Sequence, residues 1–163
     1  MYDSAAGNPH GPMRRKDREI ADRGEIDRII REGKVMHLAL SDHDVPFLVP
    51  VFYGYDGTAL YFHSAKAGTK MEIMKKNDKA CFEISLDHGI VESAIACDFE
   101  ARHRTVIGLG KAVLVTDAAE KIKALDLIVK NLTDRKFDYP QANLGATQVV
   151  RIDIQSIKGK KFG

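Results

Sequence analysis

Apolar and polar residues alternate along two segments of the chain, the pattern of a strand that buries one of its faces. Residues 79–86 place Ala80, Phe82, Ile84 and Leu86 on one side, and residues 148–157 set Val150, Ile152 and Ile154 against Arg151 and Asp153. Apolar runs at 33–41, 45–54 and 59–63 predict three more strands. The Asp56-Gly57 pair between the last two supplies the dihedrals of a hairpin turn.

Residues 99–115 predict a long strand pair or one bent strand, in which Gly108 and Gly110 mark a bulge or a close backbone approach. Helical spacing appears in residues 22–33, which begin with a capping residue, Asp22, and in residues 116–132, which begin near Asp117. A shorter helix is expected at 70–76, and the stretches 87–98 and 134–145 are expected to be loops. The pattern predicts a mainly β protein with flanking helices, a small closed antiparallel barrel of six strands.

Length and composition favour one soluble domain over residues 13–163, preceded by a disordered tail at 1–12. A net charge of +2, without aromatic residues interleaved along a basic stripe, argues against a nucleic-acid partner. No apolar run approaches the ~20 residues of a membrane span. Cys81 and Cys97 lie far apart and no secretory segment precedes them, which predicts a reduced, cytoplasmic protein.

Residues 61–72 contain the most informative chemistry. An apolar strand ends near His63 and Ser64, and Thr69 opens a helix with Glu72 three positions later, a capping-box pattern. The unpaired N–H groups of a helix start attract an anion, and Lys70 adds a cation beside them. The segment is either a phosphate cradle or an ordinary strand-to-helix loop with a solvated lysine.

The order of several short stretches resembles the FMN-binding split-barrel superfamily, the pyridoxamine 5'-phosphate oxidase-like proteins. Within it the chain is most similar to the branch named for 5-nitroimidazole antibiotic resistance. The similar stretches are 13–20 (MRRKDREI), 38–40 (LAL), 49–53 (VPVFY), 61–65 (YFHSA) and 104–112 (RTVIGLGKA).

The resemblance implies a homodimer that binds FMN where the two subunits meet. The flavin ring is then expected near Pro50, Val51, Phe52 and Tyr53, and the phosphate near His63, Ser64, Lys70 and one or both of Arg104 and Thr105. Physical chemistry agrees, because a phosphate dianion requires a cation and oriented N–H donors, whereas the ring requires an apolar strand. The alternative for residues 49–53 is a plain core strand.

His63 is the candidate catalytic residue: it would hold a substrate or donate a proton near neutral pH, unless it only hydrogen-bonds at the strand end. His37 and His103 are expected to be structural or at the surface, and no His, Cys and carboxylate set has metal-ligand spacing. No nucleophile elbow is present and no dinucleotide fingerprint follows a strand, so any NAD(P)H would be a transient reductant. The absence of tryptophan argues against vitamin B6 oxidation.

Three functions remain open from the sequence. The first is an FMN-dependent oxidoreductase that reduces a small acceptor such as a nitroaromatic compound or a quinone. The second is a non-catalytic flavin carrier or redox-sensing module. The third is a haem-binding split barrel with His63, His37 or His103 as the iron ligand.

Overall fold

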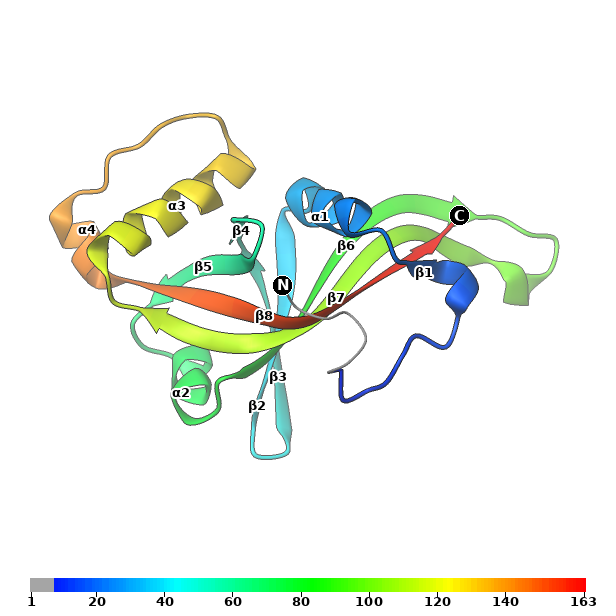
Figure 1. Cartoon of the computed structure of the whole chain (residues 1–163), viewed down its shortest axis with the longest axis horizontal. Coiled ribbons are helices and arrows are strands. Elements are labelled where there is room, and N and C mark those ends of the chain that lie inside the picture. Colours follow the sequence, from blue (N-terminus) through cyan, green and yellow to red (C-terminus); the bar gives the residue numbers. More distant parts are fainter. Residues whose placement is uncertain (1–7) are drawn as a thin grey trace.

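The structure, a computed structural model, describes residues 8–163. Its strands are β1 (Glu19–Ile20), β2 (Val35–Asp42), β3 (Val45–Phe52), β4 (Gly54–Tyr55), β5 (Ala59–Ala65), β6 (Lys79–Val91), β7 (Glu100–Val115) and β8 (Thr147–Phe162). Its α-helices are α1 (Arg23–Glu32), α2 (Thr69–Lys76), α3 (Ala118–Leu132) and α4 (Gln141–Ala146), with short 3-10 turns at Lys16–Arg18 and Ala96–Asp98. In the view of Figure 1, α1 and α3 lie above β8 and α2 lies below it.

The strands form one antiparallel sheet in the order β3-β2-β6-β7-β8-β5-β4, with β1 added against β8. The predicted class, mainly β with flanking helices on a split barrel, is confirmed. Two of the eight strands, β1 and β4, are only two residues long, so the long strands are the six that were predicted. Within residues 8–163 the end strands β3 and β4 do not pair with each other, so the expectation of a closed barrel is wrong.

Strands β7 and β8 run side by side from the pair His103 and Phe162 to the pair Val115 and Val149. The register shifts between Leu109 and Gly110, which is the predicted bulge. Gly108 meets the predicted close approach, because a Cβ there would collide with the ring of Phe82. Both glycines therefore have the structural role that the sequence assigned to them.

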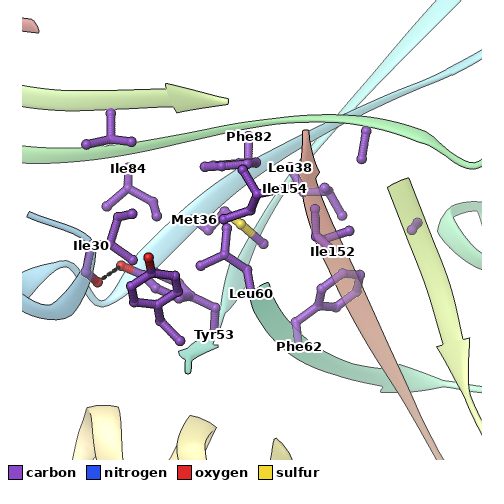
Figure 2. Close-up of a cluster of buried hydrophobic side chains, with 14 of the residues drawn as sticks. Ile30, Met36, Leu38, Tyr53, Leu60, Phe62, Phe82, Ile84, Ile152 and Ile154 are labelled. Atoms are coloured by element: carbon purple, nitrogen blue, oxygen red, sulfur yellow. Dashed lines mark hydrogen bonds between the residues drawn. The ribbon is translucent and has the colours of Figure 1, made fainter. Parts of the chain in front are cut away.

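The core lies where α1 and the inner faces of the strands meet. Figure 2 shows Ile30 from α1 near Met36, Leu38, Tyr53, Leu60, Phe62, Phe82, Ile84, Ile152 and Ile154 from the strands. Each of these side chains is buried, and on the strands the period-two alternation directs them inward. A second, smaller cluster forms where α3 covers β5 and β8.

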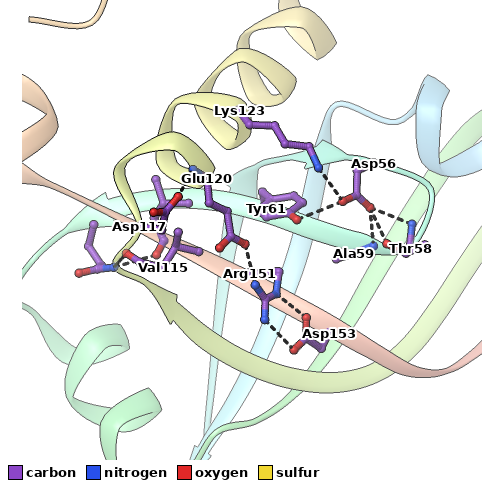
Figure 3. Close-up of polar contacts among 12 residues, drawn as sticks. Asp56, Thr58, Ala59, Tyr61, Val115, Asp117, Glu120, Lys123, Arg151 and Asp153 are labelled. Atoms are coloured by element: carbon purple, nitrogen blue, oxygen red, sulfur yellow. Dashed lines mark hydrogen bonds and ion pairs between the residues drawn. The ribbon is translucent and has the colours of Figure 1, made fainter.

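The predicted caps of the two longer helices form. The Asp22 carboxylate accepts hydrogen bonds from the N–H groups of Gly24 and Glu25, and Asp117 accepts one from Glu120 at 2.8 Å. Figure 3 shows how polar contacts fasten α3 to the sheet, with Glu120 bound to Arg151 at 2.6 Å. The same figure shows Asp56 at the turn before β5, where it receives hydrogen bonds from Thr58, Ala59 and Tyr61.

Both expected loops contain regular structure. Strand β6 continues to Val91 through an irregularity between Asp87 and Ile90, where Gly89 has a φ of 90°, and a 3-10 turn follows at Ala96–Asp98. Helix α4 occupies part of 134–145. Of the tail expected to be disordered, residues 1–7 lie outside the described residues, while Asn8 donates a hydrogen bond to Ser156 at 3.2 Å.

Candidate functional site

Within residues 8–163, no side chain caps the start of helix α2. Gly68 is its N-cap residue, with a φ of 112°, a positive value that favours glycine. Thr69 is the first residue of the helix, so it cannot cap it, and the predicted capping box with Glu72 is wrong. The first turn closes when the N–H groups of Met71 and Glu72 donate to the Gly68 carbonyl. The N–H groups of Thr69 and Lys70 find no acceptor within residues 8–163, so they are available to an anion.

Lys70 is a half-buried cation at this helix start. Its Nζ lies 5.9 Å from the centre of the Phe62 ring, and burial lowers the pKa of the ammonium group. Among the residues that the structure describes, no carboxylate forms an ion pair with it. A partly desolvated lysine without an acidic partner is suited to bind an anion.

His63 and Ser64 lie at the end of β5 that leads to this helix. They pair in register with Val149 and Gln148 of β8. The His63 side chain is exposed and Ser64 is half-buried, whereas the preceding residue, Phe62, is fully buried. Lys70 contacts Phe62, and successive side chains of a strand point to opposite faces. Lys70 therefore lies on the face of β5 that Phe62 shares with Ser64, whereas the exposed His63 points to the other face.

The strand expected to contact a flavin ring, β3, forms one end of the sheet. Pro50 and Phe52 are exposed, while Val51 turns inward against the core. Proline is tolerated at a sheet edge because it has no N–H to donate. Strand β3 contacts β5, and Gly54 just beyond it pairs with Tyr61, so this edge adjoins the strand that carries His63.

Tyr53 has a different role from its neighbours. Its side chain is fully buried, and its hydroxyl donates to the Ile30 carbonyl at 2.6 Å. Burial raises the pKa of the phenol. The Tyr53 carbonyl accepts a hydrogen bond from Asn131 at 3.0 Å, so the residue joins the end of β3 to α1 and α3. Its side chain is part of the core, the alternative that the sequence left open for residues 49–53.

Arg104 and Thr105 lie elsewhere in the chain. Thr105 is ten residues from Val115 along β7, and Val115 is level with Val149 and His63. Ten residues of extended strand span roughly 33 Å. The Arg104 guanidinium donates to the Gly163 carbonyl at 2.9 Å, and Thr105 is buried. Within one chain these two residues do not join the group around Lys70.

One feature of the sheet was missed at the sequence level. Five polar side chains, which we call the His37–His103 array, are linked end to end by hydrogen bonds: His37, Glu83, Ser85, Thr105 and His103. The alternation of residues 79–86 predicts that Glu83 and Ser85 share a face. The pairing partners on β2 and β7 depend on register, which the sequence does not state.

A cavity of about 720 Å³ lies beside α1, and its lining combines Ile26, Ile154 and Ile157 with the charged residues Arg23, Asp27 and Asp153. None of the predicted site residues lines it. Within residues 8–163 no cluster of three or more His, Cys, Asp or Glu side chains is arranged to hold a metal ion. None of the helices in this range is long and apolar enough to cross a membrane. Both cysteines are free, with Cys81 half-buried and Cys97 exposed.

The sequence matches one known protein family over most of its length. A family model described as pyridoxamine 5'-phosphate oxidase matches residues 22–161. No curated protein matches the sequence.

Several solved structures share the fold. A candidate 5-nitroimidazole antibiotic resistance protein from Bacteroides thetaiotaomicron superposes with a TM-score of 0.78 and 28% identity, covering 87% of this chain and 85% of that one. The flavocytochrome Anf3 from Azotobacter vinelandii gives a TM-score of 0.86 and 24% identity, covering 99% and 77%. An FAD- and haem-binding protein from Mycobacterium smegmatis gives 0.80 and 17%, covering 88% and 73%. At their lower identities, the last two show similarity of fold alone.

Proposed function

The chain belongs to the pyridoxamine 5'-phosphate oxidase family, and on that premise we propose that it is an FMN-dependent oxidoreductase that reduces a small acceptor. The acceptor would be a nitroaromatic compound, such as a nitroimidazole, or a quinone. Similarity to a candidate 5-nitroimidazole resistance protein supports the nitroaromatic class.

The observation that carries the proposal is the anion-binding character of the α2 start. The half-buried Lys70 ammonium has no carboxylate partner within residues 8–163, and the N–H groups of Thr69 and Lys70 lack acceptors there. A flavin phosphate would provide a negative charge for the ammonium group and acceptor oxygens for the N–H groups. The residues present therefore fit the group.

The edge of β3 fits the remainder of a flavin. Pro50 and Phe52 present apolar surface beside a strand edge that no other strand of residues 8–163 pairs with, which suits a planar ring held through backbone groups. A bound flavin would supply electron or hydride transfer at its ring N5. The exposed imidazole of His63 would hold the acceptor or donate a proton to it.

A homodimer is part of this proposal. Leu48 and Phe52 lie on one face of β3 with Pro50 between them, and they retain 66% and 51% of their accessible surface. This is apolar surface at a sheet edge, which a second copy would cover. In such a dimer Arg104 and Thr105 would approach the flavin held mainly by the other subunit.

The two free cysteines favour a reducing compartment. We therefore place the protein in the cytoplasm. NAD(P)H is available there as a transient reductant.

The activity assay supplies purified protein with reduced nicotinamide and follows the loss of an added nitroimidazole or quinone. We expect turnover that depends on the protein and on bound flavin. Flavin-loaded protein that turns over no acceptor with any reductant would contradict the catalytic assignment and leave a flavin carrier or redox-sensing module.

Haem binding is the second candidate. Two structural relatives are a flavocytochrome and an FAD- and haem-binding protein. The exposed His63 side chain has no hydrogen bond within the described chain that would compete with iron. Nδ1 of His37 and of His103 is already hydrogen-bonded, which makes these two rings poorer candidates at that nitrogen. A Soret absorption band would favour haem.

A further inference from the structure

The His37–His103 array spans three strands. His37 Nδ1 lies 2.9 Å from Glu83 Oε2, and the other Glu83 oxygen accepts a hydrogen bond from Ser85 Oγ. Ser85 Oγ lies 2.7 Å from Thr105 Oγ1, which lies 2.9 Å from His103 Nδ1. Two imidazole rings are thereby joined through one carboxylate and two hydroxyl groups.

The sheet register explains why these side chains meet. His37 stands directly opposite Glu83, and Ser85 stands directly opposite Thr105. Side chains two residues apart on a strand share a face, which places Glu83 beside Ser85 and Thr105 beside His103. The array is a regular consequence of strand geometry and requires no unusual backbone.

The direction of every hydrogen bond follows from the carboxylate. A carboxylate only accepts, so both His37 Nδ1–H and Ser85 Oγ–H must donate to Glu83. The single Ser85 hydrogen is then used, so Ser85 accepts from Thr105. Thr105 in turn accepts from His103 Nδ1–H, since its own hydrogen is also used.

We propose that Glu83 is a positioning residue that fixes both His37 and His103 as the Nδ1–H tautomer. The nitrogen that carries the proton in a neutral histidine is set by the hydrogen bonds that the ring makes. Each neutral ring then presents Nε2 as an unprotonated nitrogen, able to accept a hydrogen bond or a proton from a ligand.

The surroundings of His103 favour the neutral form of its ring. Burial lowers its pKa, and the positive charges of Lys160 on β8, Arg18 near the N-terminus and Arg104 on β7 lower it further, against a smaller opposing effect of Glu100. A neutral ring at pH 7 retains the Nε2 lone pair. The hydrogen bonds of the array and the positive charges around the ring therefore both favour an unprotonated Nε2 on His103.

His37 borders an open groove of about 490 Å³ whose lining includes Lys34, Ser85 and His88. His37 is opposite Pro50 on β3, so the groove adjoins the strand to which we assign the flavin ring. We assign this groove to a small ligand that brings an O–H or N–H donor to His37 Nε2. Identifying that ligand as the electron acceptor rests on the proposed function, whereas the tautomer assignment does not.

Long-range ¹H–¹⁵N correlation spectra of histidine-labelled protein test the tautomers directly. At about pH 8.5, well above the ordinary imidazole pKa, both rings are expected to show a protonated Nδ1 and an unprotonated Nε2. The variants His37→Gln and His103→Gln identify each ring among the six histidines. A protonated Nε2 on either ring in the unaltered protein would overturn the proposal.

Two substitutions test whether Glu83 sets the direction of the hydrogen bonds in the array. In Glu83→Gln the amide accepts on one side and donates on the other, so the array no longer enforces Nδ1–H on both rings, and at least one ring should gain the Nε2–H tautomer. Thr105→Val removes the acceptor of His103 and the hydrogen donated to Ser85 but leaves the contact between Glu83 and His37. The His103 ring should therefore lose its Nδ1–H preference while His37 keeps it. Unchanged tautomers in either variant would contradict the proposal, and the second variant covers the case in which the first fails to fold.

Phenol and anisole form a matched pair of probes for the groove, because they differ in one donated hydrogen. Phenol should shift the His37 Nε2 resonance and anisole should not. Equal shifts, or no shift with phenol, would overturn the ligand assignment. A protein that binds no flavin but passes both tests would refute the proposed function and leave this inference standing.

Discussion

The ammonium group of Lys70 lies 5.9 Å from the centre of the Phe62 ring, at the junction of β5 and α2. The contact orients the lysine, while burial lowers its pKa by disfavouring the charge. No carboxylate within residues 8–163 offsets that cost. Binding of an anion would offset the cost of desolvating this charge, so the Lys70 ammonium group is well suited to bind one.

Replacing Lys70 with alanine should therefore weaken FMN binding without weakening the fold. We expect a loss of roughly 1.5–3 kcal/mol in binding free energy if the lysine makes a charge-assisted bond to phosphate. The stability of the flavin-free protein should stay level or rise slightly, because a partly desolvated charge is removed. Fluorescence titration and thermal unfolding measure the two effects separately.

Lys75→Ala is the matched control, since Lys75 is exposed in the last turn of the same helix. It should leave FMN affinity unchanged. If Lys70→Ala also leaves the affinity unchanged, Lys70 does not belong to the cofactor site.

His63→Ala should fold and bind FMN but lose most reductase activity. The side chain is exposed at the end of β5, so its removal opens no cavity. Loss of a general acid typically lowers the rate by about 10²–10⁴-fold. The measurement is kcat for a nitroimidazole or quinone beside His10→Ala, an exposed histidine outside the site. Full activity in His63→Ala would refute the catalytic assignment.

Leu48→Asp should convert the proposed dimer to monomer. Leu48 is 66% exposed in the single chain. A charge there costs the monomer little, whereas it would be buried against a second copy. Sedimentation velocity distinguishes the two masses. Leu132→Asp, at a leucine that is 46% exposed on α3, should leave the mass unchanged. A monomeric unaltered protein would contradict the dimer.

Asp56→Asn should reduce stability at neutral pH but not in acid. Burial alone would raise the pKa of Asp56, but hydrogen bonds from Ala59, Thr58 and Tyr61 lower it to about 2. A lowered pKa contributes stability that is present above the unfolded value, about 3.9, and is lost as the pH falls through the folded value. We expect a deficit of about 1–2 kcal/mol in urea unfolding at pH 7 that closes between about pH 4 and about pH 2. A deficit independent of pH would show that the charge is not responsible.

The alternating segments 79–86 and 148–157 predicted β6 and β8 correctly because one face of each is buried, and burial is what the pattern encodes. Asp22 and Asp117 marked helix starts for a local reason, since a cap binds N–H groups two or three residues away. The same reasoning gave the wrong start for α2. Gly68, with its positive φ, takes the N-cap position there and leaves Thr69 inside the helix.

Long-range features were less accessible. Phe62 and Lys70 are close in sequence, so their contact lay within reach of prediction. Thr105 instead lies on β7, a strand of 16 residues, about ten residues from the end that is level with His63. The contact between Ser85 and Thr105 depends on the register of β6 against β7, which cannot be read from the sequence. Tyr53 continued the apolar pattern of β3, yet its hydroxyl reaches α1.

The absorption spectrum of freshly purified protein, before and after dithionite, tests the central claim most directly. Two flavin bands that bleach on reduction are expected, and chromatography of the released cofactor should identify FMN rather than FAD. A Soret band would instead support haem and remove Lys70 from its assigned role. A colourless protein that also fails to bind added FMN would contradict the account.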